Sequence, residues 1–189
     1  LDMIPAALGQ SADWIPACEI FGEGIFFQFN RDRIEEWKAS LSERKLEILE
    51  GMERGIEESG LRFLPKATPE LLMIHTFSHL MMRQLCFECG YSASSLKERL
   101  YVNEADMCGV LIYTADGDSE GTLGGLVRQG SASRLGRVMM QALHDAQWCS
   151  ADPICQESKN QGFAGLNGAA CHACTLVSEV SCEYSNTLL

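Results

Sequence analysis

The pattern of apolar and polar side chains predicts a long amphipathic helix in the first third of the chain. Over residues 31–59, apolar positions recur at helical spacing and the opposite face is charged. Asn30 can cap the start of this helix, and Gly60 can end it. The apolar positions are Ile34, Trp37, Leu41, Ile48, Met52 and Ile56.

A second helix is predicted from Thr68 to about Glu88. Thr68 is a good capping residue, Pro69 suits the first helical position, and Gly90 provides a stop. Apolar residues cover nearly the whole circumference of this helix, which predicts that it is central and buried.

Strands are indicated in two regions. Residues 107–114, MCGVLIYT, form an almost unbroken apolar run that predicts a buried strand. In residues 14–29, aromatic and β-branched residues lie on both sides of Gly22–Gly24. This arrangement predicts a pair of strands joined at the glycines.

Two further helices complete the predicted elements. A short one covers Leu96–Leu100, with Ser95 and Glu98 placed for a capping box. A Ser/Gly-rich loop leads into another, which ends near Trp148. Together the elements predict an α/β fold, with a small mixed sheet built on Val110–Tyr113 and the long buried helix packed against it.

Composition limits the possible functions. The chain has 189 residues, 46% of them apolar, and a net charge of −11. Because phosphate binding requires positive charge, this balance argues against an autonomous DNA-binding protein. We find no signal peptide and no apolar run of membrane-spanning length, so we expect a cytoplasmic protein in a reducing environment.

The cysteines carry the clearest chemical signal. The spacing of Cys171 and Cys174 places two thiolates on one turn, where both can reach one metal ion. Structural zinc takes four ligands, so the local set has one cysteine too many, and we expect Cys182 to be the spare. His172, inside the turn, is a weaker candidate ligand. Five of the nine cysteines lie within 34 residues: Cys149, Cys155, Cys171, Cys174 and Cys182.

Two other interpretations of these cysteines remain open. Disulfides would need an oxidising compartment, which nothing in the sequence indicates. A redox C-x-x-C pair usually stands alone at the start of a helix after a strand. Zinc explains the fivefold cluster better than either alternative.

Two more pairs of metal-binding residue types lie on the helix predicted from Thr68. His75 and His79 have the i, i+4 spacing of zinc-binding helices, but Thr76 stands where such motifs carry a glutamate. We expect both histidines to be hydrogen-bonded core residues, with metal binding as the alternative. Cys86 and Cys89 could join the zinc site only if the two regions meet in space.

Charged residues in the middle of the chain suggest two roles. An acidic turn after the buried strand carries Asp116, Asp118 and Glu120. We expect it to face a partner or DNA, although with His75 and His79 it could surround the open metal site of a hydrolase or nuclease. The best local basic patch, and so the candidate DNA contact, consists of Arg128, Arg134 and Arg137.

Several segments, taken together and in order, resemble the MrfA-like zinc-binding domain. They cover roughly residues 70–189, with WIPACEIFGEGIF near the start as a further match. The resemblance implies a domain found at the C-terminal end of certain DNA helicases and in helicase partners. The matching segments read HTFSHLMMRQLCFECGYSASSLKERLYV, GVLIYTADGDSEGTLGGLV, WCSADPIC, AACHAC and SCEYSN.

The resemblance also sets the expected organisation and function. Residues 1–66 are an N-terminal segment with the strand pair and the long helix. Residues 67–189 form the zinc-binding domain, with a cysteine-ligated zinc turn at one edge, cut from a larger protein. The family implies a non-catalytic zinc module that works with a superfamily 2 DNA helicase on foreign DNA in anti-phage defence. The alternatives are a metal-dependent hydrolase or nuclease and a purely structural interaction scaffold.

Overall fold

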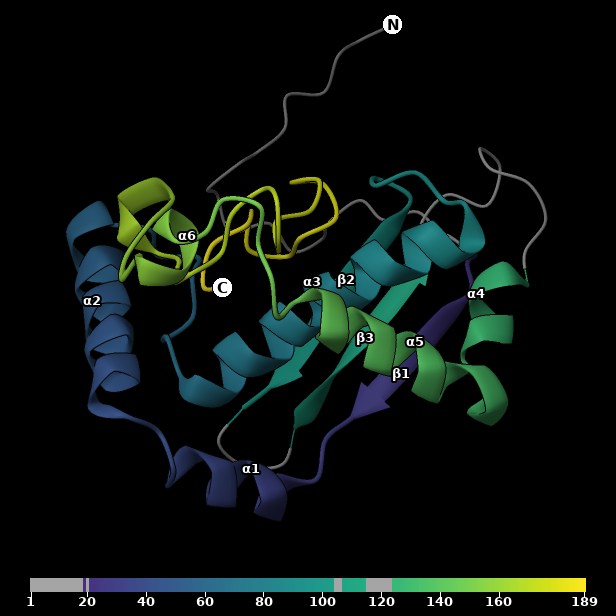
Figure 1. Ribbon diagram of the computed structural model, residues 1–189, viewed down its shortest axis with the longest axis horizontal. Coiled ribbons are helices and arrows are strands. Elements are labelled where there is room, and N and C mark those ends of the chain that lie inside the picture. Colours follow the sequence, from purple (N-terminus) through teal and green to yellow (C-terminus); the bar gives the residue numbers. More distant parts are fainter. Residues whose placement is uncertain (1–18, 20, 104–106, 115–123) are drawn as a thin grey trace, which may run out of the picture.

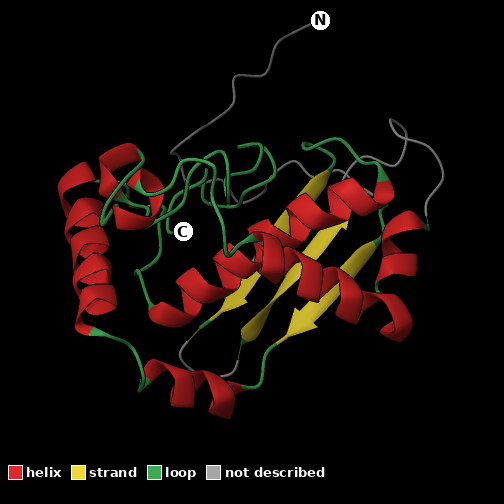
Figure 2. Ribbon diagram, in the orientation of Figure 1, coloured by secondary structure: helices red, strands yellow, loops and turns green. Residues whose placement is uncertain are grey.

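The computed structural model describes residues 19, 21–103, 107–114 and 124–189. Within them, the helices at residues 69–89 and 132–145 lie over one face of a three-stranded sheet (Figures 1 and 2). A loop-rich segment, residues 146–189, lies at one end. The elements are β1 (Gly24–Gln28), α1 (Arg31–Lys38), α2 (Glu43–Ser59), α3 (Pro69–Cys89), β2 (Leu96–Val102), β3 (Cys108–Thr114), α4 (Gly125–Gln129), α5 (Ala132–Asp145), α6 (Ile154–Glu157) and a 3-10 turn, η1 (Phe163–Gly165).

The sheet has β3 at its centre, paired antiparallel with β1 on one side and β2 on the other. In β1, Ile25 and Phe27 are buried and the residue between them is exposed. In β2, Leu96, Glu98 and Leu100 are buried and the residues between them are more exposed. Such alternation is expected for strands with one covered face. The α/β class is confirmed, and the sheet expected to be mixed is antiparallel in both pairings.

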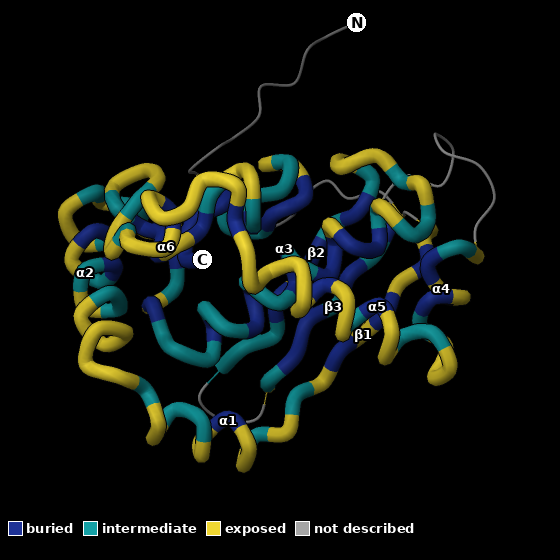
Figure 3. The backbone as a smooth tube through the Cα atoms, viewed as in Figure 1, coloured by how far each residue is buried: buried dark blue, intermediate teal, exposed yellow. Residues whose placement is uncertain are grey.

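Helix α3 forms the centre of the core and packs across β2 and β3. Its predicted ends are confirmed: the hydroxyl of Thr68 accepts the Leu71 N–H at 3.3 Å, and Gly90 ends the helix at a φ of 75°. That left-handed conformation favours glycine. Figure 3 shows buried positions concentrated along α3 and the strands. The fully buried apolar residues of α3 are Ile74, Met81, Met82 and Leu85.

The short helix expected over Leu96–Leu100 is wrong, because these residues begin strand β2. Leu96, Glu98 and Leu100 alternate on the buried face. A buried glutamate in the middle position interrupts the apolar–polar alternation by which a strand is recognised. Glu98 therefore looked like a capping residue, although its side chain lies in the protein interior.

The single helix expected over residues 31–59 is also wrong, because α1 and α2 are separate helices. The Ser40 hydroxyl donates to the Trp37 carbonyl at 2.7 Å, and Ser42 is the N-cap of α2. Serine hydroxyls compete for backbone groups in this way and favour helix ends. Of the strand pair expected in residues 14–29, β1 is the second member, and the first falls mostly outside the described residues.

Glu23 connects the start of β1 to the start of α4. Its carboxylate accepts the N–H groups of Gly124, Leu126 and Val127 at 2.9–3.0 Å and the hydroxyl of Tyr91 at 2.6 Å. Burial raises the pKa of Glu23, but these four donors outweigh burial and leave the pKa below its ordinary value of 4.5. The carboxylate thus satisfies backbone donors that the start of a helix leaves unpaired.

Residues 146–189 contain the short α6 and η1 joined by loops (Figure 2). The end of this segment is held by long-range hydrogen bonds. The Leu188 N–H donates to the Leu166 carbonyl at 2.8 Å, and the Leu189 N–H donates to Asn167 Oδ1 at 3.1 Å. Within the described residues, no helix combines the length and the apolar character needed to cross a membrane.

Candidate metal centre

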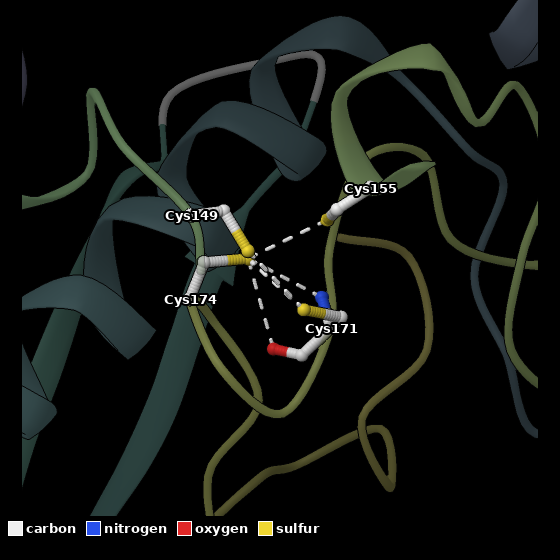
Figure 4. Close-up of side chains that lie close together, drawn as sticks. All are labelled: Cys149, Cys155, Cys171 and Cys174. Carbon is white, nitrogen blue, oxygen red and sulfur yellow. Dashed lines mark hydrogen bonds between the residues drawn. The ribbon is translucent and has the colours of Figure 1, made fainter. Parts of the chain in front are cut away.

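Four cysteine sulfurs converge beside α3, within the loop-rich segment (Figure 4). The sulfurs of Cys149 and Cys171 are 3.5 Å apart, those of Cys171 and Cys174 3.7 Å, and those of Cys155 and Cys174 3.8 Å. A tetrahedral zinc ion with Zn–S bonds near 2.3 Å sets its sulfurs about 3.8 Å apart. The four sulfurs therefore already have the spacing that zinc requires.

The first two sulfurs are presented by a compact turn that follows α5. The Cys149 N–H donates to one oxygen of Asp152 at 3.0 Å, and the Gln156 N–H donates to the other oxygen at 3.1 Å. Cys155 lies on α6 between these contacts. Asp152 thus fixes the turn that brings the two cysteines together, although they are separated by five residues.

The other two sulfurs come from the Cys171–Cys174 turn. The N–H groups of Cys174 and Thr175 both donate to the Cys171 carbonyl, at 3.2 and 2.9 Å. The Cys174 sulfur accepts the Cys171 N–H at 3.4 Å and the Thr175 hydroxyl at 3.2 Å. Donors aimed at a sulfur stabilise its thiolate form, which is the form that binds metal.

The pKa values within the cluster differ in direction. Burial raises the pKa of Cys171, but backbone N–H donors outweigh it and lower that pKa to about 7. Burial raises the pKa of Cys155 to about 12. Four sulfurs this close repel one another as thiolates, so all four can ionise together only around a cation. A divalent metal ion supplies that charge and deprotonates the thiols that bind it.

The other cysteine and histidine candidates lie outside this cluster. The Cys182 sulfur is 3.1 Å from Nε2 of His75, in a different part of the core. His172 is exposed, although it lies within the turn. The thiols of Cys86 and Cys89 donate to backbone carbonyls just after α3 and at the start of α4, at 3.4 and 3.7 Å.

The histidines of α3 are fully buried, as predicted, but their partners were not foreseen. Nε2 of His75 lies 2.9 Å from Oε1 of Glu98, and Nε2 of His79 lies 3.3 Å from the same oxygen. Burial lowers the pKa of His75, but the Glu98 carboxylate and the Cys182 sulfur outweigh burial and raise it to about 10. Burial raises the pKa of Glu98, but the two imidazoles hold it well below its usual range.

The proposed DNA-contacting arginines lie on α4 and α5. Arg128 and Arg137 are exposed, and Arg134 is half-buried. The Arg137 guanidinium is 3.7 Å from a carboxylate oxygen of Glu88, so part of its charge is already balanced. The acidic turn lies outside the described residues, together with its members Asp116, Asp118 and Glu120.

Known proteins are similar to this chain at two levels. Residues 77–175 match the family model of the MrfA Zn-binding domain. The chain is also 41% identical over 180 residues to the DISARM protein DrmB of Bacillus paralicheniformis. This alignment covers 94% of the chain and 32% of DrmB, so the chain spans about a third of the length of this relative.

The family match and the geometry agree on the metal. The matched range contains Cys149, Cys155, Cys171 and Cys174, the four residues whose sulfurs have the tetrahedral spacing, and it ends before Cys182. Four thiolates at this spacing are the ligand set of structural zinc sites. Zinc is thus the cofactor, and the chain belongs to the MrfA Zn-binding domain family.

Proposed function

We propose that this chain is the zinc-binding module of a DISARM-type anti-phage defence protein. In this role it acts without catalysis of its own, partners a superfamily 2 DNA helicase and helps that complex hold DNA. The similarity to DrmB over 94% of the chain is the observation that carries this proposal. The helicase partnership rests on the family resemblance, and the surface of the domain adds physical support.

The zinc chemistry favours a structural role. A metal with four cysteine ligands has no free coordination position for water or substrate, whereas catalytic zinc keeps one. The metal instead joins two distant parts of a loop-rich segment that has little regular structure of its own. A metal-dependent hydrolase or nuclease would need a different, open site.

An exposed aromatic surface beside the zinc cluster fits a protein partner. A groove of about 810 Å³ runs between α3 and α5, and Cys174 forms part of its lining. Phe87 and Trp148 also line the groove, with exposed fractions of 84% and 72%. Aromatic side chains exposed to this extent are typical of interaction sites, where they supply much of the binding energy.

Binding to the helicase tests this surface. Phe87→Ala and Trp148→Ala should each weaken binding of the full-length protein to the helicase by roughly tenfold or more, as expected for aromatic hot spots. Phe163→Ala is the matched control, because Phe163 is 67% exposed but lies on η1. Equal binding by all three variants would contradict the proposed docking surface.

DNA contact is tested on the helicase complex. Replacing Arg128 and Arg137 with glutamine should reduce the salt dependence of DNA binding by about one phosphate contact per arginine. Arg62→Gln, also an exposed arginine, is the control. An unchanged salt dependence would favour the alternative of a structural scaffold without DNA contact, which the net charge of −11 supports.

A further inference from the structure

A second group of metal-ligand types lies in the core, away from the four-cysteine cluster. One ligand atom from each of His75, His79, Glu98 and Cys182 lies within 4.8 Å of the others. The histidines come from α3, the glutamate from β2 and the cysteine from the C-terminal loop. Both histidines are fully buried, and Glu98 and Cys182 are only 4% and 8% exposed.

The outer nitrogens of both imidazoles are held by backbone carbonyls. Nδ1 of His75 lies 3.0 Å from the Leu188 carbonyl, and Nδ1 of His79 lies 3.2 Å from the Thr175 carbonyl. A carbonyl only accepts, so each Nδ1 carries a hydrogen and donates. When a metal ion displaces the proton on Nε2, that nitrogen presents its lone pair to the centre of the cluster. Metal-binding histidines are oriented in this way by their second nitrogen.

The hydrogen bonds inside the cluster are unevenly shared. Oε1 of Glu98 faces both Nε2 atoms and also accepts the Glu183 N–H at 3.2 Å. Oε2 of the same carboxylate is buried, and among the described residues it has no hydrogen-bond partner. An unpartnered carboxylate oxygen in a protein interior is costly unless it is paired or binds a metal.

We propose that His75, His79, Glu98 and Cys182 bind a second divalent transition-metal ion. Imidazole nitrogen, carboxylate oxygen and thiolate sulfur are all common ligands of zinc. Two neutral imidazoles, one carboxylate and one thiolate balance the charge of such an ion. Binding releases the thiol proton and any proton on the Nε2 atoms, and forms bonds to two nitrogens, one oxygen and one sulfur.

The distances allow this site with a small expansion. Around tetrahedral zinc, bonds of about 2.0–2.3 Å place nitrogen, oxygen and sulfur ligands about 3.3–3.6 Å apart. The observed distances from His75 Nε2 are 2.9 Å to Glu98 and 3.1 Å to Cys182. The separation between His79 Nε2 and Glu98 is 3.3 Å. Movements of about half an ångström therefore suffice to admit the ion.

The second site has no open coordination position, and its role is structural. Four protein ligands complete a tetrahedron, and their burial keeps water away from the metal. The ion would hold α3, β2 and the C-terminal loop together at one point. Thr175 links it to the first site, because its carbonyl accepts from His79 while its hydroxyl donates to Cys174.

The test is a count of zinc ions per chain by native mass spectrometry and elemental analysis, on protein purified without chelators. We expect two zinc ions in the wild type. Glu98→Gln and Cys182→Ser should each retain one, while Cys171→Ser should lose the zinc of the four-cysteine site. Cys89→Ser is the matched control and should retain two, because Cys89 belongs to neither cluster.

The wild-type count decides the proposal even if a variant fails to fold. One zinc ion per wild-type chain would overturn the second site, and its retention by folded Glu98→Gln and loss from Cys171→Ser would place that ion at the four cysteines. The cluster would then be a buried network of hydrogen bonds and ion pairs. Two ions in the wild type and one in folded Glu98→Gln would establish it, and X-ray absorption should then show nitrogen and oxygen among the zinc ligands.

Discussion

At the scale of single residues, Thr175 contacts both clusters. Its hydroxyl donates to the Cys174 sulfur at 3.2 Å, and its carbonyl accepts from His79 at 3.2 Å. The side chain is also buried, so water cannot replace the hydroxyl easily. A residue that only touches a ligand can still set metal affinity, because it stabilises the thiolate and fixes its direction.

The variant Thr175→Val tests this contact, since valine keeps the shape and the carbonyl but removes the hydroxyl. We expect roughly tenfold weaker zinc binding at the four-cysteine site, which is the usual size of such an effect. Competition with a chromophoric chelator measures it. Thr187→Val is the control, because the Thr187 hydroxyl donates to the Tyr184 carbonyl instead. Equal zinc affinity of both variants would show that the hydroxyl has no influence.

The residue scale also shows which ligands a sequence can reveal. Cys171 and Cys174 are close in sequence, so their spacing alone predicts a shared metal. Glu98 could not be found in this way, because it lies 19 residues from His79 and 85 from Glu183, which contact it through the fold. For the same reason, the sequence could suggest that Cys182 was spare but not that it lies beside His75.

At the scale of elements, α4 depends on one carboxylate. Its first turn begins next to residues outside the described part of the chain, and Glu23 accepts the N–H groups of the N-cap Gly124 and of Leu126 and Val127. The helix has only five residues, which is too short to be stable alone. Glu23 therefore helps to position α4 and, through it, the start of α5.

The pKa of Glu23 predicts a pH-dependent contribution to stability. Because this pKa is lower in the folded state than its ordinary value of 4.5, the carboxylate stabilises the fold above pH 4.5. This contribution is lost as the pH falls below 4.5 through the folded-state pKa. Glu23→Gln should thus lower the free energy of unfolding by about 1–3 kcal/mol at pH 7, and by less at pH 4.

Urea unfolding of wild type and variant at both pH values measures this difference. The comparison at each pH removes effects common to both proteins, including loss of zinc in acid. Glu57→Gln, at an exposed position of α2, should change the free energy of unfolding little at either pH. A difference between wild type and Glu23→Gln that is the same at both pH values would contradict the prediction.

Elements whose apolar and polar residues follow a regular pattern were predicted well. Elements in which one residue departs from that pattern, or in which the pattern continues across a break in the backbone, were not. The apolar run of β3 and the capped ends of α3 gave their positions correctly. Strand β2 was missed because its buried Glu98 breaks the apolar–polar alternation. The histidines that contact this glutamate lie on α3, far away in sequence. The break between α1 and α2 was missed because the apolar spacing continues across it, while the Ser40 hydroxyl binds the Trp37 carbonyl and Ser42 is the N-cap of α2.

At the scale of the whole molecule, the buried apolar residues are unevenly distributed. The apolar core lies mainly between α3 and the sheet, whereas residues 146–189 contribute only Leu166 and Leu188 to its fully buried members. A segment with few apolar contacts needs other restraints, and metal bonds can supply them. The loop-rich segment should therefore depend on zinc more strongly than the sheet does.

Removal of zinc should separate these two parts. After treatment with a strong chelator, amide hydrogen exchange should become fast over residues 146–189, while the β3 amides remain protected. Mass spectrometry of proteolytic fragments measures this pattern, and added zinc should restore protection. Equal loss of protection along the entire chain would show that zinc holds the molecule together as one cooperative unit.

The hydrogen bond between His75 and the Leu188 carbonyl joins residues 113 positions apart. During translation, α3 leaves the ribosome long before the residue that completes its environment. His75 therefore lacks its carbonyl partner until Leu188 has left the ribosome, and this part of the core forms late in synthesis. A nascent chain arrested with residues 176–189 still in the exit tunnel should be cleaved by protease within α3, whereas one with residue 189 outside should resist.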